Sequence, residues 1–138
     1  MKFIALTIVT ATLLGVSAVA QDSQSISKAQ TVASTWLALV DAGKYSDSWE
    51  LSAGPFKSAV SKVSWAAAVG GVRAPLGALK SRQIQSSTFT HTLPGAPDGN
   101  YVVIKYASQF ENKGSAVETV APLQEKDGTW HESGYFVN

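Results

Sequence analysis

The stretch that decides the fold runs from Tyr101 to Phe110 and reads YVVIKYASQF. Apolar residues recur on one face, while Lys105 lies on the other. The apolar face consists of Val102, Ile104, Tyr106 and Phe110. A period of two is typical of a strand that covers a core with one face. We therefore predict a strand over residues 101–110.

Three further strands are predicted before and after this one, because clusters of turn residues divide the second half of the chain into short segments. Short turns at Asn112–Gly114 and Lys126–Gly128 indicate hairpins, and the longer Leu93–Gly99 loop is rich in glycine and proline. The predicted strands span residues 80–91, 101–110, 116–123 and 129–137. Connections this short favour an antiparallel meander.

The first half of the chain has helical periodicity instead. Apolar residues at helical spacing are Ala29, Val32, Ala33, Trp36, Leu37 and Val40. They predict a helix over residues 28–42, with Ser27 and Gln30 as a capping box and Gly43 as its stop. Shorter helices are expected at residues 46–52, from Pro55 and from Ser64. The residues expected along one side of the Pro55 helix are Phe56, Ala59, Val60 and Val63.

Helices followed by a run of strands indicate an α+β fold, in which the helices pack on one face of a four-stranded antiparallel sheet. A twisted sheet of this kind, with helices across its concave face, would form a cone. The order of elements is similar to the cystatin-like and nuclear-transport-factor-two-like folds.

The first twenty residues have the pattern of a secretory signal peptide. Lys2 supplies a positive start, residues 3–16 are mostly apolar, and Ala18–Ala20 offers small residues before Gln21. We predict cleavage after Ala20, a single domain over residues 21–138, and a periplasmic or secreted protein without a membrane span. The alternative is an uncleaved anchor, for which the apolar run is slightly short. The chain contains no cysteine, which excludes lipid attachment at a cysteine.

Composition excludes several classes of function. The chain carries 11 basic and 10 acidic residues, and loss of Lys2 with the leader makes these numbers equal. With this balance the chain lacks the excess of positive charge that is typical of proteins that bind nucleic acid or anionic membranes. The two histidines, His91 and His131, lie in separate predicted strands with no second ligand at suitable spacing, so we expect no metal site. No phosphate loop is present, and no cofactor is expected.

Two carboxylates on predicted strands, Glu118 and Glu132, are the candidate catalytic residues. Strict alternation places Trp130, Glu132, Gly134 and Phe136 on one face. If that face is buried, the pKa of Glu132 would rise and its carboxylate could act as a general base. Alternatively, this is an edge strand or its other face, with Tyr135, points inward. Asp41, at a helix end, is expected to make local hydrogen bonds.

Aromatic residues form the other notable set. Those that could line a pocket between helices and sheet are Trp49, Trp65, Tyr106, Phe110 and Trp130. Aromatic residues at such positions also build ordinary cores, so the set allows either a ligand pocket or a filled interior.

Four groups of residues are together similar to a known family. They are Trp36–Tyr45 with Ser48 and Trp49; Val72–Gly77 with Ser81 and Arg82; Leu93–Gly99 with Tyr101–Ile104; and Ala116–Val120 with Asp127, Gly128, Trp130 and Gly134–Phe136. They resemble the bacterial exported-protein family catalogued as domain of unknown function number four thousand and nineteen. The resemblance implies a small exported protein and supplies no catalytic residues. His131 and Glu132 stand where a basic and an apolar residue are expected for this family.

Three functions remain open on this basis. The first is a non-catalytic binding or accessory module for a small apolar ligand or an envelope protein. The second is a cone-fold enzyme in which Glu132 or Glu118 is the base and Tyr106 or Tyr135 is the proton donor. The third is an interaction domain that forms a homodimer through its open sheet face.

Overall fold

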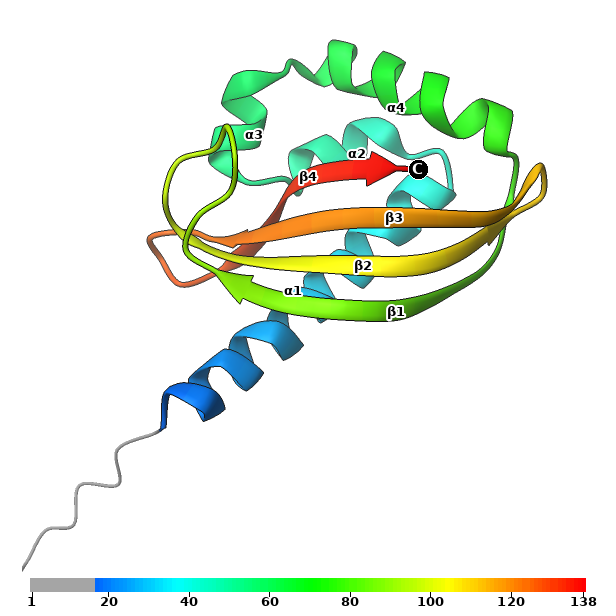
Figure 1. Ribbon diagram of the computed structural model, residues 1–138. Helices are drawn as coiled ribbons and strands as arrows, with labels where there is room; N and C mark the ends of the chain where they lie inside the picture. Colours follow the sequence, from blue (N-terminus) through cyan, green and yellow to red (C-terminus); the bar gives the residue numbers. More distant parts are fainter. Residues whose placement is uncertain (1–16) are drawn as a thin grey trace, which may run out of the picture.

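The computed structural model describes residues 17–138, and these form an α+β fold with four helices before four strands (Figure 1). The elements are α1 (Ala18–Asp41), α2 (Tyr45–Glu50), α3 (Gly54–Ala59), α4 (Lys62–Leu76), β1 (Leu79–Thr90), β2 (Asn100–Phe110), β3 (Lys113–Gln124) and β4 (Trp130–Val137). The predicted α+β class and all four predicted strands are thus confirmed, with small shifts at the strand ends.

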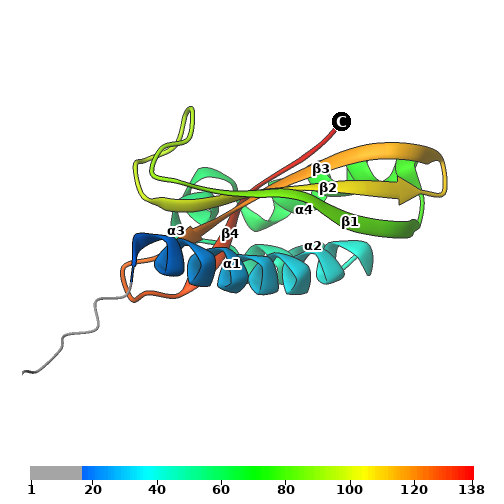
Figure 2. The same cartoon turned by 60° about the horizontal axis from the view of Figure 1, so that its bottom comes forward.

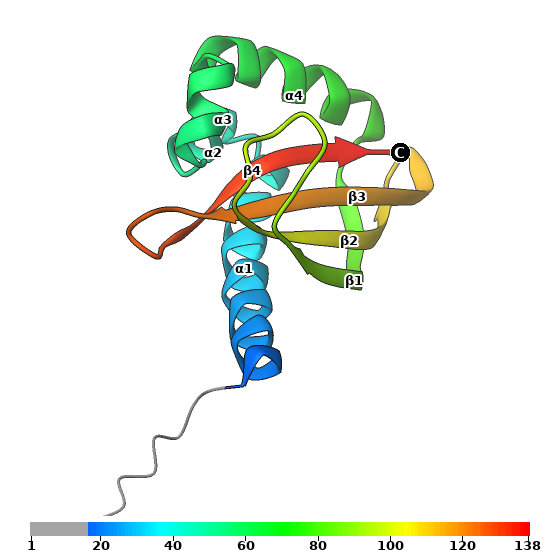
Figure 3. The same cartoon turned by 60° about the vertical axis from the view of Figure 1, so that its left-hand side comes forward.

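The strands form one antiparallel sheet in the order β1-β2-β3-β4, as expected for a meander. Helix α1 crosses one face of this sheet and contacts all four strands (Figure 2). Helix α4 packs against α2 and lies beyond the β4 edge of the sheet (Figure 3). The loop between β1 and β2 folds over one end of the opposite face, where Tyr101 Oη donates to the carbonyl of Pro97 at 2.6 Å.

The core lies between α1 and the sheet. Helix α1 contributes the buried residues Ala29, Ala33, Trp36, Leu37 and Val40, and the strands contribute Val102, Ile104, Tyr106, Val120 and Trp130. The apolar faces predicted for the helix and for the strands therefore pack against each other, which removes their apolar surface from water. The Trp36 indole N–H donates to the carbonyl of Ser48 at 2.9 Å and to Ser52 Oγ at 3.1 Å, which fixes α2 against α1.

Helix α1 begins earlier than the sequence predicted. Its N-cap is Ser17, whose Oγ accepts from the backbone N–H of Ala20 at 3.3 Å, so the capping box predicted at Ser27 is wrong. Most residues from 18 to 28 are exposed, and such a polar helical extension has no apolar stripe to reveal it. The apolar run of the predicted leader, residues 3–16, lies outside the described residues. Within residues 17–138, no helix combines the length and apolarity needed to cross a membrane.

The chain breaks between α3 and α4, where one apolar side was predicted to continue. Val60 is extended (φ −139°), and Ser61 caps α4 by accepting from the backbone N–H of Ser64 at 3.2 Å. Val63 consequently points to solvent and is 79% exposed, so the prediction that it continues the side of Phe56 is wrong. At the other end of α4, Gly77 has φ +74°, and a Cβ there would lie 2.9 Å from Glu111 Cβ.

Strand β4 contains a bulge that changes which side chains face the helices. Pro122 pairs with Glu132 but Val120 pairs with Tyr135, so β4 has one residue more than β3 between these pairs. Trp130 and Glu132 therefore point inward, which is one of the two alternatives left open by the sequence, and after the bulge Tyr135 of the other predicted face points inward as well. Phe136, which strict alternation placed on the same face as Trp130, is 70% exposed, so that grouping is wrong.

Candidate functional site

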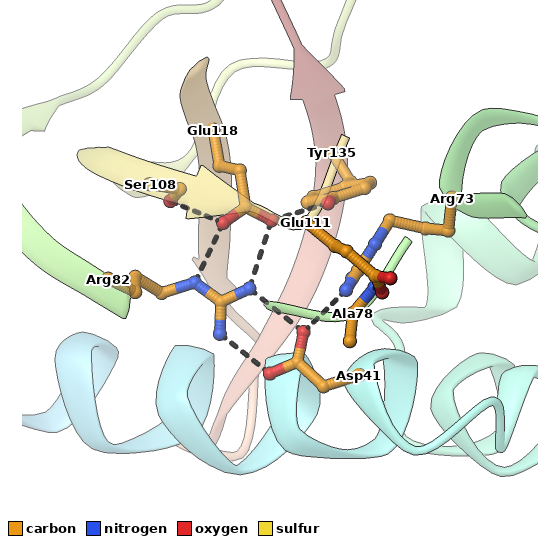
Figure 4. Close-up of polar contacts among 8 residues, drawn as sticks. All are labelled: Asp41, Arg73, Ala78, Arg82, Ser108, Glu111, Glu118 and Tyr135. Carbon is orange, nitrogen blue, oxygen red and sulfur yellow. Dashed lines mark hydrogen bonds and ion pairs between the residues drawn. The ribbon is translucent and has the colours of Figure 1, made fainter. Parts of the chain in front are cut away.

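A network of charged side chains is buried between the sheet and the C-terminal end of α1, with Glu118 of β3 at its centre (Figure 4). Arg82 of β1 donates to Glu118 through Nε at 2.7 Å and Nη2 at 3.1 Å. Ser108 Oγ donates to the same carboxylate at 2.6 Å, and the Tyr135 hydroxyl donates to its second oxygen. Glu118 thus accepts four side-chain hydrogen bonds, which occupy the lone pairs that a general base would use.

Asp41, the last residue of α1, extends this network towards the surface. Arg82 donates to its two carboxylate oxygens at 2.8 and 2.9 Å, and Arg73 of α4 donates to Oδ1 at 2.9 Å (Figure 4). The expectation of purely local hydrogen bonding by Asp41 is therefore wrong. The residue joins α1 to α4 and to β1.

The network balances two cations against two carboxylates. Burial alone would lower the pKa of Arg82, but its hydrogen bonds to Asp41 and Glu118 outweigh burial and raise it. Burial, followed by the charge of Glu118, raises the pKa of Tyr135. Arg82 therefore stays charged and the Tyr135 hydroxyl stays protonated, so both are suited to stabilising the fold and not to transferring protons. The Arg73 guanidinium stacks on Phe110 at 4.9 Å, and its Nε and Nη1 find no hydrogen-bond partner within residues 17–138.

Glu132 is a separate buried carboxyl group with a different role. Its Oε1 accepts from the backbone N–H of Ala121 at 2.8 Å and of Ser133 at 3.3 Å, so it satisfies donors that the β4 bulge removes from the ladder. Burial raises the pKa of Glu132 to about 8. Its Oε2 and the hydroxyl of Tyr106 have no partner in the described part of the chain, and burial followed by the Glu132 charge raises the pKa of Tyr106 to about 12.

None of the hollows described here is lined by all five aromatic residues predicted to form one pocket, although Trp65, Tyr106 and Trp130 belong to the same core. Trp65 packs against Trp36 and Phe56, with ring centroids 5.7 and 5.0 Å apart. Trp49 donates its indole N–H to the carbonyl of Val60 at 2.8 Å. Phe110 lies under Arg73, and Tyr106 and Trp130 each line a different surface hollow.

The hollow at Trp130 belongs to a groove between α1 and β4. Two hollows of about 220 and 390 Å³ share Thr31, Val32 and Trp130, and we call them together the α1–β4 groove. The first is also lined by Thr35, Trp36, Leu51 and His131, and the second by Lys28, Gly128 and Thr129. Lys28 and Thr35 are seven residues apart on α1, which makes the groove about 10 Å long.

The polar groups on the helix side of this groove have partners within the protein. The hydroxyls of Thr31 and Thr35 donate to carbonyls four residues earlier in α1, at 3.1 and 3.2 Å. The Trp36 indole N–H is occupied by α2. Leu51, in contrast, is 47% exposed at one end of the groove. The groove therefore presents apolar surface with few hydrogen-bonding groups left to satisfy.

Two other hollows differ in character. One of about 840 Å³ lies at the tip of the sheet, where its lining includes Asp98, Glu125, Lys126 and Asp127. Another of about 220 Å³ lies between α1 and β1, lined in part by Arg82 and Tyr106. Glu118 and Glu132 line neither of these hollows nor the α1–β4 groove.

Within residues 17–138, no three of the histidine, aspartate and glutamate side chains converge in a way that could hold a metal ion. His131 lies 3.4 Å from Glu125, and His91 faces Asn100 at 3.0 Å, so the two histidines have separate neighbours.

Most of the chain matches one protein family. A family model described as a protein of unknown function (DUF4019) matches residues 32–135, which include every member of the charged network and most of the groove. No curated protein and no solved structure matches the chain. Because the family model covers most of the sequence, the chain belongs to the DUF4019 family.

Proposed function

We propose that this protein is a non-catalytic binding module that holds a small apolar ligand in the α1–β4 groove. The observation that carries the proposal is the lining of the groove, in which Val32, Leu51 and Trp130 offer apolar surface while the threonine and indole donors of α1 are already bonded. Binding sites for small molecules are mostly apolar and concave, and Leu51 leaves about half of its surface exposed at one end of this groove.

The enzyme alternative has less support from the geometry. Four side-chain hydrogen bonds occupy Glu118, and backbone N–H groups of the bulge occupy one oxygen of Glu132. A general base must come within hydrogen-bond reach of a substrate proton. Neither carboxylate lines the groove or the neighbouring hollows, so a substrate placed there would not reach them.

Self-association through the open sheet face also has an argument against it. Lys105 is exposed on β2, near the middle of that face. Face-to-face packing of two copies on this surface would bury the charge of Lys105, which is costly without a partner. Ligand binding in the groove is therefore the function that we favour.

We expect the protein to work after export, as a periplasmic or secreted domain. Ala18–Ala20 and the residues that follow to Gln24 are exposed, so cleavage after Ala20 would remove no core contact. Intact mass spectrometry of the protein recovered from the cell envelope or medium should give a chain that begins at Gln21. A full-length chain recovered with the membrane fraction would contradict this expectation.

Replacing Leu51 by serine should weaken binding of 1-decanol, our probe of the groove, by about five-fold. Full burial of a leucine side chain is worth about 1.5–3 kcal/mol, and Leu51 has about half of its surface left to bury, which corresponds to roughly 1 kcal/mol. Isothermal titration calorimetry on the mature chain would measure the change, with 1-butanol as a ligand too short to fill the groove.

The matched control is Val63→Ser, because Val63 is an exposed apolar residue of α4 that does not line the groove. This variant should bind 1-decanol as the unmodified protein does. Equal weakening by both substitutions would indicate nonspecific adsorption. No binding of 1-decanol by a folded protein would refute the proposed function.

We also propose that the arrangement of α1 on the sheet is a variant of the cystatin-like or nuclear-transport-factor-two-like cone. The support is the position of α1 across one face of a twisted antiparallel sheet (Figure 2). The α1–β4 groove lies between this helix and the last strand.

A further inference from the structure

The two ends of the α1–β4 groove differ chemically. The apolar end is formed by Leu51 and Trp36, and the other end by Lys28, the glycine of the hairpin turn and Thr129. Lys28 lies one turn before Val32 on the same side of α1, so its ammonium group reaches the mouth of the groove. A ligand that lies along α1 would therefore contact apolar surface at one end and the charge of Lys28 at the other.

The carboxylates near the Lys28 end are already engaged. Asp127 Oδ1 accepts from the backbone N–H of Thr129 at 3.0 Å and from its hydroxyl at 2.6 Å. Glu125 Oε1 accepts from the backbone N–H of Gly54 at 2.9 Å and lies near His131. Lys28 makes no ion pair within residues 17–138. The cation at this end of the groove therefore has no internal partner among the described residues.

We infer that the ligand is a single-chain amphiphile with a carboxylate head, held with its tail along Val32 and Trp130 and its head at Lys28. This inference rests on the proposed function, since the tail needs the groove. The apolar tail supplies most of the binding by burial, and the head sets the orientation through a charge-assisted hydrogen bond. A cationic amphiphile of the same length would place like charges together at Lys28.

The test compares three ten-carbon probes that differ only in the head: decanoate, 1-decanol and decyltrimethylammonium. Calorimetric titration of the mature chain at low salt should give the order decanoate, then 1-decanol, then decyltrimethylammonium. The expected advantage of decanoate over 1-decanol is about three-fold, the size of an exposed ion pair. Because the pair is exposed, added salt should reduce this advantage.

The variant Lys28→Gln isolates the head contact, since it keeps a polar side chain of nearly the same length but removes the charge. It should bind decanoate about three-fold more weakly and 1-decanol unchanged. Lys44→Gln is the matched control, because Lys44 is an exposed lysine beyond the far end of α1 and should leave both affinities unchanged.

The outcomes separate this inference from the proposed function. Suppose that decanoate binds no more tightly than 1-decanol and that Lys28→Gln changes neither affinity. The groove would then hold an apolar ligand, and the assignment of a carboxylate head would be wrong. Tighter binding of decyltrimethylammonium than of decanoate would also overturn it. Failure of every probe would reject the proposed function itself.

Discussion

Replacing Arg82 by methionine should lower the free energy of unfolding by about 3–5 kcal/mol. The substitution keeps much of the side-chain volume but leaves Glu118 without its two guanidinium hydrogen bonds, in a site where the carboxylate is fully buried. Removing one partner of a buried ion pair costs this much because the remaining charge stays desolvated. Urea denaturation at pH 7, followed by circular dichroism, would measure the loss.

A double-variant cycle tests whether the loss comes from the ion pair. Glu118→Gln removes the buried charge, so the combination with Arg82→Met should be less destabilising than the sum of the two single changes. Lys80→Met, on the same strand and exposed, should change stability by less than about 0.5 kcal/mol. If Arg82→Met lowers the free energy of unfolding by less than about 1 kcal/mol, the network does not stabilise the fold.

Stability should fall as pH rises from 6 to 8, and Glu132 should account for a large part of the fall. The pKa of Glu132 is raised to about 8 in the folded protein and is near its ordinary value when unfolded. Between these values the folded state binds a proton that the unfolded state does not, so stability decreases with rising pH. At about 1.4 kcal/mol for each pH unit, the decrease over this range is on the order of 2 kcal/mol.

The variant Glu132→Gln should remove this dependence, because the amide oxygen still accepts from the bulge N–H groups while nothing titrates. Glu50→Gln is the control: Glu50 is exposed, its hydrogen bond to Lys62 lowers its pKa, and it is ionised in both states above pH 6. Its pH profile should match that of the unmodified protein. Identical slopes for Glu132→Gln and the unmodified chain would mean that Glu132 does not bind the proton.

Much of the fold could be predicted from local pattern. The period-two residues of β2 are buried as expected, and the apolar stripe of α1 faces them. The start of α1 could not be found in this way, because residues 18–28 are mostly exposed and leave no periodic signal. The β4 bulge was missed because one additional residue reverses the alternation after Glu132.

The charged network was beyond the reach of a single sequence. Its four charged members come from α1, α4, β1 and β3, and the hydrogen bonds among them join residues 32 to 41 positions apart. The sequence did contain one signal: Glu118 alternates with Ala116 and Val120 on the inward face of a predicted strand, and a carboxylate there requires a cation. Only the fold identifies Arg82 as that cation.

The most direct test of the central claim is a titration of the isotopically labelled protein with 1-decanol, followed by nuclear magnetic resonance of methyl and indole groups. The chemical-shift changes should centre on Val32, Leu51 and Trp130, saturate together, and leave the exposed methyls of Val63 unchanged. Shifts centred on the 840 Å³ hollow around Tyr101 and Leu123, or no saturable shift in a folded protein, would contradict the claim.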